Sequence, residues 1–303
     1  LYDRNYSESR VPAVPSAILE TMSHQNYNDM RYGPDPNLKF TLARAIYKSI
    51  LRYVSDMHGK DYAVAPLAPD HFAISMDSDG EATLTWQAVS DPSEPTAEPT
   101  GYVVYTSTGS AGFDNGTHVQ GTKTKVRLEP GVLYSFRVAA VNKGGRSFPT
   151  EVLSAAYTPG AKSTVMIVNA FNRLASPEVK MEADSWRFDI DADPGISYGK
   201  TATWLGRQLD CNPSTAGKEG PGGLGYSDES LMGLFVAGND FNYVATHARA
   251  LHSAGLYNII SCSDEALASG SADLTHCDMA DVIFGLERND GYSLMKYEVM
   301  SAA

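Results

Sequence analysis

The chain has 303 residues, a length that accommodates two or three domains of ordinary size. Its net charge of −12, with no basic stretch to offset it, excludes an electrostatic grip on nucleic acid or on an anionic membrane surface. Hydrophobic residues make up 43% of the sequence, enough for packed cores, yet no apolar run approaches the roughly 20 residues of a membrane span. Because Leu1 is not a start methionine and residues 292–303 read as a helix still running, we expect a piece of a longer polypeptide.

The first segment, residues 1–62, combines a short apolar run with a long amphipathic pattern. Val11–Leu19 is apolar, is interrupted by two prolines, and is expected to form a strand that ends at Glu20. Apolar residues then recur every three or four positions across Lys39–Val54, which predicts an amphipathic helix of about four turns. A strand, a loop and one helix cannot close a core of their own. We therefore expect this segment to be the corner of a larger fold or to dock on its neighbours.

The second segment begins after the proline-rich linker Ala65–Pro69, where the hydrophobic period changes from 3.6 residues to 2. Short runs rich in Val, Thr, Tyr and Phe are separated by glycine-containing turns, and no helical pattern interrupts them. This pattern predicts an antiparallel β-sandwich of about 90 residues. The expected strands are Ala82–Trp86, Gly101–Thr106, Thr124–Leu128, Tyr134–Val141 and Thr150–Ala156.

This sandwich segment resembles a fibronectin type III domain over residues 66–159. The likeness is carried by Trp86 in the second strand, by Gly101–Tyr105 in the third, and above all by the stretch from Leu128 to Asn142. The resemblance implies that Tyr134 is the tyrosine corner, whose hydroxyl bonds back to upstream backbone. It also implies a spacer or a binding platform rather than an enzyme.

The third segment, residues 163–303, alternates strand and helix patterns. Ser163–Asn169 is a continuous apolar run, typical of a strand buried on both faces. The alternation predicts parallel βαβ units in an open α/β sheet, whose ligands usually bind beyond the carboxyl ends of the strands. The whole chain is thus predicted to be multidomain, α/β plus all-β. The remaining expected elements are strands at Leu231–Ala237, Tyr257–Ser261 and Met279–Leu286 and helices at Tyr243–Ala254 and Asp264–Ser269.

Glu20 stands at the end of the expected first strand and faces a polar loop. The run Val14–Asn26, together with Leu42–Val54, resembles the closing strand and helix of zinc-dependent N-acetylmuramoyl-L-alanine amidases. The resemblance implies that Glu20 acts on a zinc-bound water as general base or steadies the developing oxyanion. The alternative is a glutamate that caps a loop.

The amidase resemblance does not include the zinc ligands of the family. A catalytic zinc needs about three protein ligands and one open position. The family's ligands, two histidines and a glutamate, lie upstream of the matched segment, where this chain has only residues 1–10. His24 and His58 fit neither those positions nor a paired ligand spacing. The resemblance therefore predicts that this chain alone holds no zinc and is inactive. Either an N-terminal part is missing and zinc belongs to the intact parent, or the amidase fold is a relic.

A glycine-dense stretch in the third segment, Glu219–Asp228, is a candidate for substrate binding. It lacks the lysine of a phosphate loop and the glycine pattern of a dinucleotide site. Its bare backbone amides could receive an anion or a sugar hydroxyl, and a long structured turn is the alternative. The candidate residues are Gly222, Gly223, Gly225 and Asp228.

Cys262 directly follows the expected strand, at the start of a helix. The helix dipole would stabilise a thiolate there, and glutamine amidotransferase-like domains place a nucleophile at such a turn. The glycines that flank such an elbow are absent, so a buried, inert cysteine is the alternative. The three cysteines are too few for a disulfide scaffold, and their odd number leaves at least one free or paired outside the chain. The candidate bases are His247, His252 and His276.

The order of an amidase-like end, a fibronectin module and an α/β domain resembles large secreted hydrolases of gut Bacteroidetes, often labelled xanthan lyase or amidase. This likeness implies an extracytoplasmic location and peptidoglycan or polysaccharide as the partner. Two function classes stay open: part of a cell-wall or polysaccharide hydrolase, or a non-catalytic surface protein that binds glycan or protein. A cysteine-dependent, amidotransferase-like activity at Cys262 is a third hypothesis.

Overall fold

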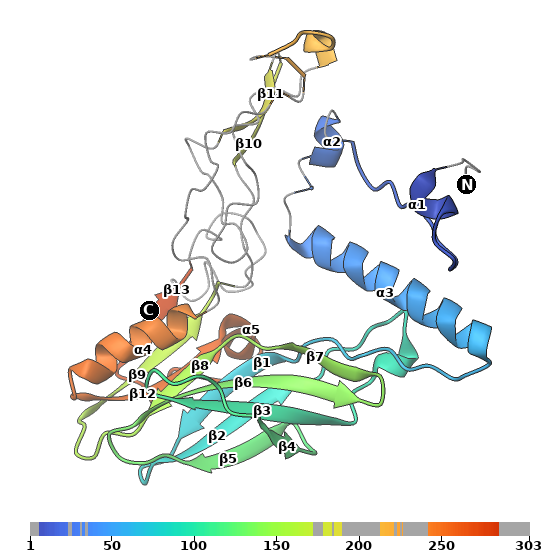
Figure 1. The fold of residues 1–303 in the computed structure, drawn as a ribbon. Helices are drawn as coiled ribbons and strands as arrows, with labels where there is room; N and C mark the ends of the chain where they lie inside the picture. The colour runs from blue at the N-terminus through green and yellow to red at the C-terminus, as the bar shows by residue number, and fades with distance from the viewer. Residues whose placement is uncertain are drawn as a thin grey trace. The chain divides into compact units, whose positions relative to one another are not determined.

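The structure is a computed structural model (Figure 1). It describes residues 6–23, 26–30, 32–33, 36–171, 178–183, 185–189, 213–220, 223–224, 226 and 242–284. The chain divides into two compact units. The first comprises Leu1–Lys39, Ser176–Gly195 and Ala202–Leu234, and the second Phe40–Ala175, Ile196–Thr201 and Phe235–Ala303.

The first unit contains short elements. Two single helical turns, α1 (Ser7–Arg10) and α2 (Tyr27–Met30), precede a 3-10 turn, η2 (Pro213–Thr215), and an antiparallel hairpin. The hairpin consists of β10 (Glu178–Glu182) and β11 (Ser185–Asp189). The Tyr27 hydroxyl donates to the Lys180 carbonyl at 2.9 Å, and its ring lies 5.8 Å from that of Trp186. Tyr27 is therefore the buried anchor between α2 and the hairpin.

The strand expected at Val11–Leu19 is not formed, which corrects the sequence interpretation. Residues 11–23 have no regular secondary structure, and the side chains of Val11 and Leu19 are 74% and 60% exposed. The two prolines remove backbone donors that a sheet ladder needs. Among the described residues, no strand pairs with this segment. Glu20 accordingly lies exposed on an irregular segment rather than at the tip of a strand.

The second unit is built on an antiparallel β-sandwich, as its alternating sequence predicts. Its β6 strand pairs with β3 from Gly101↔Val141 to Thr108↔Tyr134, and β2 pairs with both β1 and β5. The strands are β1 (Asp70–Met76), β2 (Glu81–Gln87), β3 (Gly101–Thr108), β4 (Thr117–Val119), β5 (Lys123–Arg127), β6 (Leu133–Asn142), β7 (Gly145–Pro149) and β8 (Leu153–Ala156), with a 3-10 turn η1 (Pro95–Ala97) between β2 and β3.

Aromatic side chains fill the centre of the sandwich. Alternate residues of β2 point inward, so Leu84 and Trp86 are buried while their neighbours are half-exposed. The Trp86 ring meets that of Tyr102 edge-on, with centroids 5.4 Å apart, a favourable arrangement for two aromatic rings. The Tyr134 hydroxyl accepts a hydrogen bond from the Glu129 amide at 3.4 Å, the backward bond that a tyrosine corner makes.

The strands expected after the sandwich are parallel, as predicted. β12 (Tyr257–Ser263) pairs with β9 (Ser163–Asn169) over seven residues, and β13 (Met279–Ile283) pairs with the other edge of β9. The helices α4 (Tyr243–Ser253) and α5 (Asp264–Ala268) fall where the sequence predicts them. The strand expected at Leu231–Ala237 lies outside the described residues.

These parallel strands continue the sandwich instead of forming a detached sheet. The second edge of β12 pairs antiparallel with β8 at Ile259↔Ala156 and with β1 at Ala73↔Cys262. The buried Ser261 hydroxyl donates to the Ser154 carbonyl at 2.7 Å and accepts from its amide at 2.8 Å. Eleven described strands thus share one sheet, and β12 covers edges that would otherwise invite aggregation.

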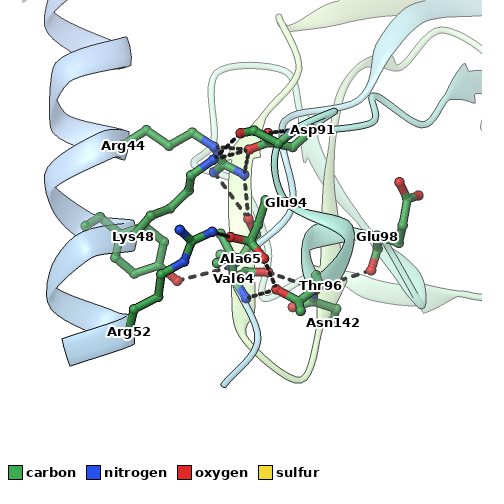
Figure 2. A network of polar contacts seen from close by, with 12 residues as sticks. Arg44, Lys48, Arg52, Val64, Ala65, Asp91, Glu94, Thr96, Glu98 and Asn142 are labelled. Atoms are coloured by element: carbon green, nitrogen blue, oxygen red, sulfur yellow. Dashed lines mark hydrogen bonds and ion pairs between the residues drawn. The ribbon is translucent and has the colours of Figure 1, made fainter. Parts of the chain in front are cut away.

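The long helix α3 (Pro36–His58) confirms and extends the helix expected at Lys39–Val54. Within the second unit it contacts the loop after β2 through ion pairs (Figure 2). Arg44 and Lys48 lie 2.9 and 3.0 Å from the Asp91 carboxylate, and Arg52 lies 2.6 Å from Glu94. None of the helices in the described part of the chain combines the length and the apolar character that crossing a membrane requires.

Candidate binding groove

A groove of about 450 Å³ lies where the sandwich meets the parallel strands. One side comes from β1, β2 and β5, and the other from β9, β12 and the loop after α5. No single segment of the sequence contains both sides. The groove exists because β12 joins the edge of β1 and thereby makes one continuous sheet face.

Strand register places the floor of the groove. Ile260 lies beside Met166 across the parallel pair, while Ala73 lies beside Thr85 across β1 and β2. Because side chains alternate along a strand, Ile260 shares a face with Cys262, which is the register partner of Ala73. Ala73, Met166 and Ile260 are buried and apolar, and they form the apolar floor of the groove.

The rim of the groove is polar. Thr83 and Thr85 contribute hydroxyls from β2, and the exposed Lys123 extends from β5. The facing rim is the loop of residues 269–278, which contributes Asp273 and His276. A hydrogen bond from Thr275 lowers the pKa of Asp273, so this carboxylate is ionised at neutral pH. Lys123 lies on one rim and Asp273 on the other, and Asp77, which follows β1, adds a second carboxylate to the Lys123 side.

The loop that makes the second rim is fixed to the sheet. The Thr164 amide donates to the Asp278 carboxylate at 2.8 Å, and the Asp278 amide donates to the Thr164 carbonyl at 2.9 Å. The side-chain amide of Gln87, at the end of β2, donates to the Ser271 hydroxyl at 3.5 Å. Because both ends of the loop are held, the rim is preorganised, which lowers the entropy cost of binding.

Cys262 packs in the same buried apolar cluster as the groove floor and has no exposed surface. Burial, followed by the neighbouring Cys277 and nearby carboxylates, raises the pKa of the Cys262 thiol far above its usual range. The hydroxyl of Ser263 caps α5 by accepting from the Ala266 amide at 3.2 Å, so it stands where the thiol was expected to benefit from the helix dipole. These surroundings oppose the thiolate that a nucleophile requires.

The thiol of Cys262 is expected to resist alkylation while the chain is folded. We predict that iodoacetamide modifies Cys262 at least about 100-fold more slowly in the native protein than in guanidinium, because labelling requires local opening. Peptide mapping by mass spectrometry at about neutral pH measures both rates, with the half-buried Cys277 as the internal comparison. Equal rates in the two solvents would show that the thiol is accessible and would contradict the burial.

The other residues singled out in the sequence are spread over the chain. Gly222, Gly225 and Asp228 lie outside the described residues, as does His24. Gly223 is buried, and its amide donates to the Gly220 carbonyl at 3.0 Å, so that amide is already used within a turn. His58 is exposed in the last turn of α3.

The candidate bases do not form one catalytic group. His247 pairs with Asp281 at 2.8 Å, and His252 is half-buried on α4. Of the three, His276 is the one that lines the groove. Among the described residues, no group of three His, Cys, Asp or Glu side chains could hold a metal ion.

Sequence reasoning missed the groove, and it also missed two unusual carboxyl groups. Burial, and then the neighbouring Glu265, raise the pKa of Glu151 to about 8, and one Glu151 oxygen is buried without a hydrogen-bond partner. Burial, and then Asp264, raise the pKa of Glu265 to about 7. Glu151 precedes β8 and Glu265 belongs to α5, so only the fold brings them together.

Comparison with known proteins identifies the sandwich. Residues 67–156 match the family model of the fibronectin type III domain. These residues are a fibronectin type III domain. No curated protein is significantly similar to the chain. The model match ends at residue 156, so β9, β12 and β13 lie outside the fibronectin type III domain, and the groove is a joint product of that domain and the strands that follow.

Solved structures match about a third of the chain. Domains A168–A170 of titin share 29% identity over 31% of this chain and 32% of theirs, with a TM-score of 0.27. The structure named FN3tt mut shares 22% identity over 31% of this chain and 97% of its own, with a TM-score of 0.26. The FN1–FN3 domains of chicken CNTN1 share 21% identity over 29% of this chain and 30% of theirs, with a TM-score of 0.25. The chain thus spans about a third of the titin and CNTN1 fragments.

Proposed function

We propose that the chain is a binding module whose groove holds an extended segment of a partner protein. The presence of a fibronectin type III domain suggests a binding or scaffold role in general. The observation that supports the specific proposal is the composite groove, with its buried apolar floor and its two fixed polar rims. Its volume of about 450 Å³ lies within the range of sites that enclose a small ligand or a few side chains.

An extended peptide suits this groove better than a glycan. Successive side chains of an extended segment point in opposite directions, so alternate residues can enter the apolar floor while the others reach the rims. Ala73, Met166 and Ile260 offer apolar area for one such side chain. The charged groups of the rims, Lys123 and Asp77 on one side and Asp273 on the other, would favour peptides whose charges complement them.

Binding to the groove can be tested without a known partner. We expect a displayed library of random peptides of about 12 residues to yield ligands for the folded chain. Thr85→Arg, which places a long cation in the groove, should weaken the selected peptides at least about tenfold in calorimetric titrations. The matched control is Thr117→Arg on β4, an exposed threonine that does not line the groove. A library that yields no ligand, or ligands that bind both variants equally, would contradict the proposal, and binding of oligosaccharides alone would favour a glycan.

The hydrolase hypothesis remains a prediction that no observation favours. Glu20 is exposed on an irregular segment of the first unit. Zinc content and peptidoglycan turnover of the intact parent, with wild type compared with Glu20→Ala, test this hypothesis directly. Equal turnover would remove Glu20 from the mechanism. The extracytoplasmic location and the peptidoglycan or polysaccharide partner likewise remain predictions.

A further inference from the structure

Two arginines and two aromatic rings stack on one another at the strands β3, β6 and β7. The Arg137 guanidinium lies over the Phe113 ring, 4.3 Å from its centroid, and 5.2 Å from the centroid of Tyr105. Arg137 and Tyr105 are direct register partners across β6 and β3. The Arg146 guanidinium lies 5.6 Å from the Tyr105 centroid and donates to the Tyr105 hydroxyl. Together these four residues form the arginine cluster.

The cations of the arginine cluster have no counter-charge. In the described part of the chain, neither arginine of the cluster forms an ion pair with a carboxylate. Asp114, in the loop after β3, uses one carboxylate oxygen to accept from the amides of Thr106 and Gly116 at 3.0 and 2.9 Å. The Nε atom of Arg137 is buried and lacks a hydrogen-bond partner among the described residues, although buried donors normally have one. Two guanidinium charges therefore stay unpaired on a chain whose net charge is −12.

The stacking leaves both guanidinium groups able to bind a ligand. An aromatic ring covers the flat face of a guanidinium, whereas all five N–H groups point outward in its plane. Arg137 is half-buried and Arg146 is exposed, so neither side chain is sealed inside the fold. The two rings beside Arg137 restrict its side chain, so binding through this group costs less conformational entropy than binding through a free arginine.

We propose that the arginine cluster binds a carboxylate side chain of a partner protein, with the Arg137 guanidinium on the two carboxylate oxygens and Arg146 as the second cation. The planar guanidinium matches a carboxylate with two parallel hydrogen bonds. Arginine and tyrosine are also the residue types that dominate the binding energy of many protein interfaces.

The charge of the chain favours a carboxylate over a polyanion. Nucleic acids and sulfated glycans present long rows of anions, which bind to matching rows of cations. This chain has a net charge of −12 and no basic stretch, so it offers two cations at this place and repels a polyanion elsewhere. Two guanidinium groups suit one carboxylate or a close pair of carboxylates on a protein.

The arginine cluster is distinct from the groove. None of its four residues lines the groove, so the proposal does not rest on the proposed function. A partner could therefore use either contact without the other. Thr85→Arg, which blocks the groove, should leave binding to the arginine cluster unchanged.

An array of acidic peptides tests the cluster. The probes are peptides of about ten residues with paired glutamates among apolar residues, each beside a copy that has glutamine instead. We expect some glutamate peptides to bind the full chain with dissociation constants of about 10 to 100 µM, and their glutamine copies to bind at least about tenfold more weakly. Arg137→Gln and Arg146→Gln should each weaken the glutamate peptides at least about fivefold. Arg127→Gln, which removes the same charge from an exposed position on β5, should bind like the wild type.

A lysine variant separates the planar guanidinium from its charge. Arg137→Lys keeps the cation but loses the two parallel hydrogen bonds, so we expect it to weaken binding nearly as much as Arg137→Gln. Circular dichroism shows whether the Arg137 variants fold, and the exposed Arg146 carries the test if they do not.

Four results would overturn the proposal. The first is an array in which no glutamate peptide binds at about 1 mM. The second is wild-type affinity in folded Arg137→Gln and in Arg146→Gln. The third is loss of the selected peptides in Thr85→Arg, which would place them in the groove. The fourth is tighter binding of heparin or of a phosphopeptide than of every glutamate peptide, which would make the ligand a polyanion or a phosphate.

Discussion

Raising the pH from about 5 to about 9 is expected to lower the free energy of unfolding by about 3 to 5 kcal/mol, mainly through Glu151. Burial raises the pKa of this carboxyl to about 8 in the folded chain, above its ordinary value. The unfolded chain therefore loses the proton near its ordinary pKa while the folded chain keeps it. This contribution to stability is complete below the ordinary pKa and is lost as the pH rises through about 8.

The surroundings of Glu151 strengthen this pH effect. Glu265 and Asp264 from α5 and Asp70 from β1 all raise its pKa, and a backbone hydrogen bond lowers it without offsetting them. Glu265 itself has a raised pKa, so its contribution to the free energy of unfolding also falls as the pH rises. The Glu151 charge in turn raises the pKa of the Cys262 thiol in β12.

Glu151→Gln removes the ionisation while keeping the shape. At about pH 9 the variant should be more stable than the wild type by about 3 kcal/mol, and its stability should depend less on pH. Urea unfolding at several pH values, followed by fluorescence, measures both quantities. The exposed Glu129→Gln is the matched control and should follow the wild type. Parallel pH profiles of Glu151→Gln and wild type would show that Glu151 is not responsible.

Removing the Asp91 carboxylate is expected to cost about 3 kcal/mol, because it leaves two cations without their partner in a poorly solvated contact. Asp91 binds Arg44 and Lys48 at 2.9 and 3.0 Å. The loss should be concentrated at α3, whose amides should exchange with deuterium much faster in Asp91→Ala. The exposed Asp79→Ala, in the turn after β1, should leave α3 protected. Unchanged exchange at α3 in Asp91→Ala would mean that other contacts hold the helix.

Lowering the pH should also weaken the ion pairs between Asp91 and α3. Burial alone would raise the pKa of Asp91, but hydrogen bonds from Ser93, Lys48 and Arg44 outweigh it and hold the pKa well below its usual range. A depressed pKa means that the stabilisation is present above the ordinary value of 3.8 and is lost as the pH falls toward the folded value. The docking of α3 should therefore weaken in acid, the reverse of the direction expected for Glu151.

The sandwich was predictable because short stretches of sequence are enough to identify its strands and turns. Alternating apolar residues in β2 and β6, with glycine turns between strands, specify which face is buried. Three strands were missed for equally local reasons. β1 has a shift in register between Asp70 and Ala73, β4 has only three residues, and β7 has five residues and begins at a glycine.

The junction was not predictable, because it depends on which strand edges meet. β12 follows residue 156 by about a hundred positions, yet it pairs with both β8 and β1. Periodicity identifies β12 as a buried strand but does not say what lies beside it. The groove residues Ala73 and Thr85 were unremarkable in the sequence for the same reason: Met166 and Ile260, which complete the groove with them, come from outside the fibronectin type III domain.

The first segment misled the sequence interpretation for another reason. An apolar run satisfies the pattern of a strand whether or not a neighbour exists, and Val11–Leu19 has no pairing strand among the described residues. The helix α3 was predicted with nearly correct bounds, but its orientation was not. Periodicity locates the apolar face of a helix, but it does not reveal that the charged face of α3 contacts the sandwich.

Deuterium exchange of the full chain, with and without a peptide selected from the library, tests the binding site most directly. We predict slower exchange at the amides of β1, β12 and residues 269–278 when the peptide is present, and no change at β4, which lies away from the groove. Protection confined to β4 or to the turns at the other end of the sandwich, with the groove strands unaffected, would contradict the account.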